Sequence, residues 1–133
     1  MTEFKGVLYG VSVITNIAIF ELFQKLPNLL IFFLLLMLTD ILLGTLQALK
    51  NKKISTKKIY NGGLKKITIL IVITISYFID LYLLNNPAEY IFNSTILYYS
   101  FLELLSISKN ANKLGVKLPK AILQVIENLR EKE

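Results

Sequence analysis

Three stretches of the chain are almost entirely apolar, and polar segments separate them. They cover residues 29–49, 67–84 and 90–107. An α-helix rises about 1.5 Å per residue, so these segments of 18 to 21 residues reach about 27–32 Å, the hydrocarbon thickness of a bilayer. The pattern predicts an all-α membrane protein whose 133 residues form one domain with three transmembrane helices.

The segment before the first span, residues 1–27, has a different pattern. Polar residues recur there at steps of four, three and four, which indicates an amphipathic helix with a narrow polar stripe. Only 15 residues separate the charges of Lys5 and Glu21, which is short for a membrane span. We therefore favour a helix that lies on the outer interface or inserts in part, and the alternative is a fourth span. The stripe consists of Lys5, Tyr9, Ser12 and Asn16.

The C-terminal segment, residues 109–133, is polar and rich in lysine. Pro119 suits the first turn of a helix, and apolar residues follow it at helical spacing. We expect an amphipathic tail helix that lies on the inner membrane surface or pairs with a partner. The apolar stripe consists of Leu118, Ile122, Val125, Ile126 and Leu129.

Basic residues are concentrated in two segments. Of the 15 lysines and arginines, 13 lie in the loop formed by residues 50–66 or in the tail that begins at Lys109. Short lysine-rich segments remain in the cytoplasm, so the loop, the tail and the C-terminus are predicted to be cytoplasmic. Within the loop, Asn61-Gly62-Gly63 indicates a turn. The lysines expected to determine the topology are Lys50, Lys52, Lys53, Lys57, Lys58, Lys65 and Lys66.

Composition narrows the classes of function. Hydrophobic residues make up 54% of the chain, which leaves no room for a separate soluble catalytic domain. Cysteine and histidine are absent, so thiol chemistry, disulfides and the usual zinc or haem ligands are excluded. No nucleophile–base spacing and no phosphate-binding glycine loop is evident. We expect no enzyme activity, no cofactor and no metal.

Two further classes are disfavoured. The net charge of +6 does not indicate nucleic-acid binding, because no aromatic or recognition element accompanies the lysines. A cleaved signal peptide is not expected, since the first residues lack a strongly basic start and a small-residue cleavage site. The lipid bilayer is the expected environment.

Each predicted span carries one carboxylate, namely Asp40, Asp80 or Glu103. An acid at mid-bilayer costs about 2.5–3.5 kcal/mol to insert, so it normally faces protein or water. No lysine is expected at the depth of Asp40. On the same helix face, Gly44 and Ala48 form a pair of small residues, four apart, that lets two helices approach closely.

These intramembrane groups have three interpretations. They hydrogen-bond one another inside a compact monomer, they line interfaces between subunits or a water-filled pore, or the acids couple transport to protons or cations. The candidate helix-interface or pore-lining residues are Asp40, Gly44, Gln47, Ala48, Ser76, Asp80, Tyr99, Glu103 and Ser106.

Three motifs follow one another along residues 36–130. The first is Thr39-Asp40-Ile41-Leu42-Leu43-Gly44, followed by the lysine-rich stretch of residues 48–55. The second is Asn61-Gly62-Gly63-Leu64-Lys65-Lys66. The third is Glu103-Leu104-Leu105-Ser106-Ile107-Ser108-Lys109-Asn110, followed by Leu114-Gly115-Val116-Lys117-Leu118-Pro119. In order and spacing these motifs resemble the toxin secretion/phage lysis holin family.

The resemblance implies a multi-pass protein of the bacterial inner membrane that forms homo-oligomers. Such a holin opens lesions through which endolysin, or a large toxin, leaves the cell, and an antiholin is a possible partner. The alternatives are a small proton- or cation-coupled transporter and an antiholin-type regulator. Small four-helix exporters usually keep a single acid in the first span, whereas here acids occur in three spans, which favours the holin.

Overall fold

The computed structural model describes residues 1–131, apart from the side chains of residues 20–25. The described chain is helical and contains no strand, which confirms the all-α prediction. The helices are α1 (Thr2–Lys25), α2 (Asn28–Lys50), α3 (Thr56–Phe78), the π-helical turn η1 (Ile79–Leu83), α4 (Tyr90–Lys113) and α5 (Lys120–Glu131).

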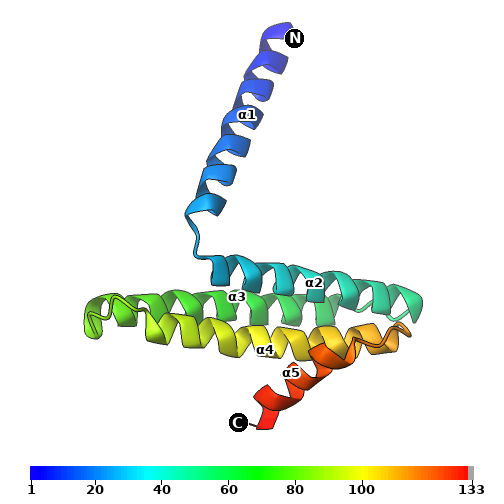
Figure 1. Ribbon diagram of the computed structural model, residues 1–133. Coiled ribbons are helices and arrows are strands. Elements are labelled where there is room, and N and C mark those ends of the chain that lie inside the picture. The colour runs from blue at the N-terminus through cyan, green and yellow to red at the C-terminus, as the bar shows by residue number, and fades with distance from the viewer. Residues whose placement is uncertain (132–133) are drawn as a thin grey trace.

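Helices α2, α3 and α4 lie side by side and form a three-helix bundle (Figure 1). Short connections join them, so consecutive helices are antiparallel. Helix α4 packs against both of the others. At the centre of the core, Phe33 and Ile96 have no exposed surface. The remaining buried members of this core are Met37, Ile69, Ile73 and Phe92.

The outward surface of the bundle is apolar. Helix α2, and α3 together with η1, are long and apolar enough to cross a membrane. Only 11% of the most apolar part of α2 and 22% of that of α3 are buried within the chain, so neither is enclosed as a core helix of a soluble protein would be. This surface fits a lipid environment. The exposed apolar residues of this surface include Leu35, Leu38, Leu42, Ile71 and Ile75.

Helix α3 begins at Thr56, well before the predicted start of the second span at residue 67. Ser55 caps it, because its Oγ accepts a hydrogen bond from the backbone N–H of Lys58 at 3.4 Å. The turn predicted at Asn61-Gly62-Gly63 is therefore wrong, since these residues are helical. Four lysines of the predicted loop lie on α3, and they are Lys57, Lys58, Lys65 and Lys66.

Helix α4 begins at Tyr90, as predicted, and continues to Lys113, beyond the predicted end at residue 107. It ends where Gly115 adopts a φ of +86°. The N–H of Val116 then donates to the carbonyl of Ala111 at 2.9 Å, the arrangement that terminates many helices. This turn directs the chain into α5.

Helix α5 is the amphipathic helix predicted after Pro119. It packs back against α4 and buries Ile126, which is 6% exposed. Three other members of the predicted stripe remain exposed, and they are Ile122, Val125 and Leu129. The tail helix therefore buries one residue of its stripe against the bundle and leaves these three exposed.

Helix α1 stands apart and points away from the bundle at a steep angle (Figure 1). The short link formed by Leu26 and Pro27 joins it to α2. None of residues 2–19 is buried. The predicted N-terminal helix is thus present, outside the three-helix bundle.

Candidate functional site: a charge cluster inside the helix bundle

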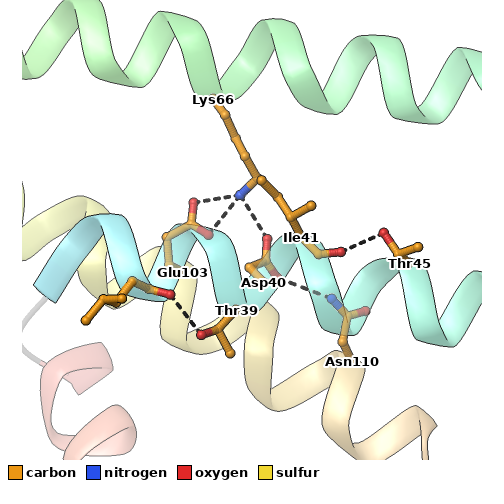
Figure 2. Close-up of polar contacts among 8 residues, drawn as sticks. Thr39, Asp40, Ile41, Thr45, Lys66, Glu103 and Asn110 are labelled. Carbon is orange, nitrogen blue, oxygen red and sulfur yellow. Dashed lines mark hydrogen bonds and ion pairs between the residues drawn. The ribbon is translucent and has the colours of Figure 1, made fainter. Parts of the chain in front are cut away.

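A lysine and two carboxylates from three different helices meet inside the bundle (Figure 2). Lys66 on α3 places its Nζ 3.0 Å from Oδ2 of Asp40 on α2 and 2.9 Å from Oε2 of Glu103 on α4. The same ammonium donates to Oε1 of Glu103 at 3.1 Å. The side chains of Lys66, Asp40 and Glu103 are only 18%, 12% and 6% exposed.

Asn110 on α4 completes the cluster. Its Nδ2 donates to Oδ1 of Asp40 at 3.2 Å, so both oxygens of that carboxylate are hydrogen-bonded. Gly44 lies beside this amide, because a Cβ at position 44 would be 3.6 Å from Nδ2 of Asn110. A Cβ would make an ordinary contact at this distance, whereas a longer side chain would have to displace Asn110. We call Asp40, Lys66, Glu103 and Asn110 the charge cluster.

The three charged residues lie at one depth along the bundle. Asp40 and Glu103 each lie ten residues before the last residue of their helix, and Lys66 lies ten residues after the first residue of its own. At about 1.5 Å per residue, each is about 15 Å from the lysine-rich end of the bundle. A charge at this depth in a bilayer is stable only where protein or water surrounds it.

The prediction that no lysine lies at the depth of Asp40 is wrong. Lys66 was predicted to lie in a loop because a glycine pair and other lysines lie near it. The local signal for an earlier helix start is the Ser55 cap. In the structure Lys66 separates two carboxylates that would otherwise repel each other. Its ammonium makes charge-assisted hydrogen bonds to both, and these are stronger than neutral ones.

A groove adjoins the charge cluster between the lysine-rich halves of α2 and α3. It encloses about 500 Å³, and Asp40, Lys66 and Asn110 form part of its lining. Small residues line both of its helical walls, and they are Gly44 and Ala48 on α2 and Gly62 and Gly63 on α3. We call this hollow the lysine-side groove.

Comparison with known proteins places the chain among its relatives. The bacteriophage holin family matches residues 10–131. The chain belongs to the bacteriophage holin family. It is 32% identical to a probable holin of Bacillus phage phi105 over 99 residues, which cover 71% of each chain. No solved structure matches it.

Two uncharacterized bacterial proteins are also similar to this chain. The protein YqxH of Bacillus subtilis is 34% identical over 102 residues, which cover 74% of this chain and 71% of YqxH. A protein of Clostridium acetobutylicum is 31% identical over 103 residues, which cover 77% and 79% of the two chains. Holins are non-enzymatic, pore-forming membrane proteins, so the chain is a membrane protein and not an enzyme.

The holin motifs converge in the charge cluster. Asp40 and Gly44 belong to the first motif, Lys66 ends the second, and Glu103 and Asn110 begin and end the first half of the third. The four members of the charge cluster are far apart in the sequence, yet they form one hydrogen-bonded group, and Gly44 lies beside it. Lys66 is the member that sequence reasoning did not assign to the intramembrane site, whereas the sequence pattern places Asn110 on one polar stripe of the third span with Tyr99, Glu103 and Ser106.

Asp80 lies outside the charge cluster, near the connection from η1 to α4. Its side chain is buried, and its Oδ1 and Oδ2 accept hydrogen bonds from the N–H groups of Ile91 and Phe92 at 3.2 and 2.7 Å. The N-cap residue Glu89 has a φ of +52° and makes no side-chain cap. Asp80 therefore caps α4 from a neighbouring element, and its charge is favourable at a helix N-terminus.

The remaining predicted residues are also separate from the charge cluster. The buried Ser76 hydroxyl donates to a carbonyl of its own helix at 2.6 Å. Tyr99 is partly buried and packs against the core of the bundle. Gln47 and Ala48 line the lysine-side groove, and Ser106 is half-buried on α4.

The chemistry of the charge cluster is ion pairing. The ammonium of Lys66 lies between the two carboxylates and pairs with both. Within residues 1–131, no group of three or more Asp, Glu, His or Cys side chains could hold a metal ion. The cluster can therefore hold three helices together or, when it is opened, present charge to water.

Proposed function

We propose that this holin associates into homo-oligomers in the bacterial inner membrane and opens lesions that release endolysin, or a large toxin, from the cell. The charge cluster supports this proposal most directly. It gathers the family motif residues within a bundle whose outer surface is apolar. The closed chain is compatible with lipid because its charged groups are hydrogen-bonded to one another inside the bundle, whereas an opened chain needs water around the same groups.

In this proposal α2, α3 and α4 are the three spans, and the lysine-rich end of the bundle faces the cytoplasm. All three helices carry lysines at that same end, as the positive-inside rule requires. The C-terminus is then cytoplasmic, and α5 lies next to the inner membrane surface. The lysines at this end are Lys50 on α2, Lys57 and Lys58 on α3, and Lys109 and Lys113 on α4.

The proposed lesion forms when α3 separates from α2 and α4 in associated chains. The ion pairs of Asp40 and Glu103 with Lys66 then break, and water hydrates the two carboxylates. Both residues line the opening together with the other candidate polar residues. Each charge that faced lipid instead would cost about 2.5–3.5 kcal/mol. Separated helices are therefore stable only around water, which favours several chains that enclose one lesion.

Ion pairing also favours the holin over a coupled transporter. A transporter must expose a carboxylate so that it binds and releases its proton or cation in every cycle. Here both carboxylates at mid-bundle are held by the same ammonium at 2.9 to 3.0 Å.

An antiholin partner would act by keeping this cluster closed.

Expression of the gene, alone and together with an endolysin, tests the proposed function. We expect an abrupt loss of culture turbidity when endolysin is co-expressed, together with a collapse of the membrane potential. Drug or cation resistance without lysis would instead indicate a transporter. Protection of cells from a second, co-expressed holin would indicate an antiholin. Either of these results would contradict the proposal.

Single cysteines test the proposed topology, because the chain has no native cysteine. Asn51→Cys in the α2–α3 connection and Val116→Cys after α4 place thiols at exposed positions. We expect neither to react with a membrane-impermeant maleimide in intact cells before lysis, and both to react once the membrane is permeabilised. Labelling of either from outside intact cells would overturn the topology.

A further inference from the structure

Helix α1 has two features that its position outside the bundle leaves unexplained. Gly6 and Gly10 lie four residues apart within this 24-residue helix, and a Cβ at either position would meet no atom within 4 Å. Glycine destabilises a helix relative to alanine, and in membranes glycine pairs at this spacing let a second helix approach closely. In addition, residues 2–19 present a long, largely apolar surface of which no residue is buried.

The bundle offers a groove in which such a helix fits. Helix α4 packs closely against both α2 and α3, whereas α2 and α3 approach each other little. The lysine-side groove lies between them at one end, and a second hollow of about 580 Å³ lies between them at the other. The second hollow is lined by apolar residues such as Leu34 and Leu70, and also by Leu26 and Pro27 of the α1–α2 link. The groove therefore begins where α1 joins the bundle.

The small residues of α1 and α2 lie at equal sequence distances before and after Pro27. Gly10 lies as far before Pro27 in the sequence as Gly44 lies after it, and the same equality holds for Gly6 and Ala48. In an antiparallel hairpin about Pro27, the two small-residue pairs lie at the same depth. The helices also match in length, because 24 and 23 residues both extend about 35 Å.

The polar stripe of α1 reaches the charge cluster in the same register. Asn16 and Ser12 precede Pro27, and Asp40 follows it. The number of residues from Pro27 to Asp40 is midway between the numbers from Pro27 to Asn16 and to Ser12, so Asp40 lies between these two residues in depth. Successive helical residues turn by about 100°, which puts this polar stripe beside the glycine stripe. A helix that lies between α2 and α3 contacts each of them with a different one of two neighbouring faces. The glycine face can therefore meet α2 while the polar face meets the charge cluster.

Charges at the far end of α1 complement the end of the groove. In the hairpin register Glu3 is level with Asn51, the first residue of the connection that follows α2. Lys53 and Lys58 line the groove at this end. The carboxylate of Glu3 therefore approaches these two lysines in the hairpin.

We propose that the chain's own α1 folds back about the Leu26–Pro27 link and occupies the groove between α2 and α3 as a fourth span. A two-residue link is long enough to join antiparallel helices. With the topology proposed above, the N-terminus then lies at the cytoplasmic end, and the groove is closed to other chains. The structure shows the other arrangement, in which α1 lies outside the groove and leaves it open.

Disulfide formation in membranes tests this proposal. Val13 and Ile41 lie at equal sequence distances on either side of Pro27, and Ile41 lines the lysine-side groove. The double variant Val13→Cys/Ile41→Cys is oxidised in isolated membranes, and a maleimide-linked polymer then shifts every chain that retains a free thiol on a gel. Val11→Cys/Ile41→Cys is the matched control, because Val11 lies on the other side of α1. The single variant Ile41→Cys reports disulfides between two copies of α2.

We expect the Val13 pair to lose the polymer shift and to remain monomeric, while the Val11 pair keeps the shift. Gly10→Leu, added to the Val13 pair, should restore the shift, because the larger side chain wedges α1 away from α2. Equal behaviour of the two pairs would overturn the proposal. A disulfide-linked dimer that is specific to the Val13 pair would also overturn it, because the occupant would then be α1 of a second copy. Since lysis is not measured, a failure of the proposed function leaves this result unaffected.

Discussion

The chain contains two buried carboxylate sites that are stabilised in different ways. Near the α3–α4 connection, Asp80 bonds to backbone N–H groups only 11 and 12 residues further along the chain. In the charge cluster, Lys66 bonds to residues 26 and 37 positions away, and Asn110 bonds to a residue 70 positions away. Asp80 depends on one local connection, whereas the charge cluster exists only while three helices are packed together.

This difference indicates which site can respond to opening of the bundle. Separation of α3 from α2 and α4 breaks the ion pairs of Lys66. The hydrogen bonds that Asp80 accepts from α4 stay in place if η1 and α4 remain together. The charge cluster is therefore suited to a conformational change, and the Asp80 cap is suited to a permanent role in the fold. Substitutions at the two sites should have different consequences.

The largest effect is expected for Lys66→Met. Removal of one partner from a buried ion pair costs about 3–5 kcal/mol, because the remaining charges are left without compensation. The matched control is Lys65→Met, since Lys65 is exposed on the same helix. The measurement is the free energy of unfolding in detergent micelles from a denaturant titration. An equal loss in the two variants would show that the charge cluster does not stabilise the bundle.

A smaller loss is expected for Gly44→Leu. The longer side chain must displace Asn110, and overpacking of this kind costs about 1–3 kcal/mol. Gly44→Ala is the control, because its Cβ would make an ordinary contact of 3.6 Å with the amide of Asn110. The same titration measures both variants. If leucine were as well tolerated as alanine, α2 and α4 would not approach closely at this position.

Asp80→Ala should destabilise the protein by about 1–2 kcal/mol, the usual cost of a lost helix cap. Asp80→Asn retains one side-chain oxygen and should lose less. Because the two sites share no partner, the losses from Asp80→Ala and Lys66→Met should add in the double variant. Strong non-additivity in the measured free energies would mean that the two carboxylate sites are coupled.

The smallest effect on stability, about 1 kcal/mol or less, is expected for Asp40→Asn, since the amide oxygen can still accept a hydrogen bond from Lys66. The net charge of the cluster changes from −1 to zero, so the time of lysis should shift while insertion is preserved. Timed lysis curves, with membrane levels checked by immunoblot, measure this. Unchanged timing would remove Asp40 from the opening step.

Much of the helical framework could be predicted from hydrophobic periodicity. The apolar segments of residues 29–49 and 90–107 lie within α2 and α4, and the stripe after Pro119 lies on α5. The start of α3 could not be predicted in this way. Its first turns are rich in lysine and contain Gly62 and Gly63, so composition indicates a loop, whereas the Ser55 cap and packing against the bundle extend the helix.

The unpredicted start of α3 limited how much of the charge cluster could be predicted. Asp40 and Glu103 were recognised because an acid in an apolar segment is conspicuous. Lys66 was not, because a lysine at the edge of a polar segment looks like a topology signal. Asn110 could be placed on the polar stripe of the third span, but its bond to Asp40 could not be predicted, because it depends on how α4 packs beside Gly44.

The central claim is that the ion pairs of Lys66 stabilise the carboxylates of Asp40 and Glu103 within the closed bundle. The most direct test compares Lys66→Met with the neutral triple variant Asp40→Asn/Lys66→Met/Glu103→Gln. Their free energies of unfolding are measured in the same detergent. The triple variant should recover most of the stability that Lys66→Met loses, because it leaves no uncompensated charge in the bundle. A triple variant that is as unstable as Lys66→Met, or less stable, would contradict the claim.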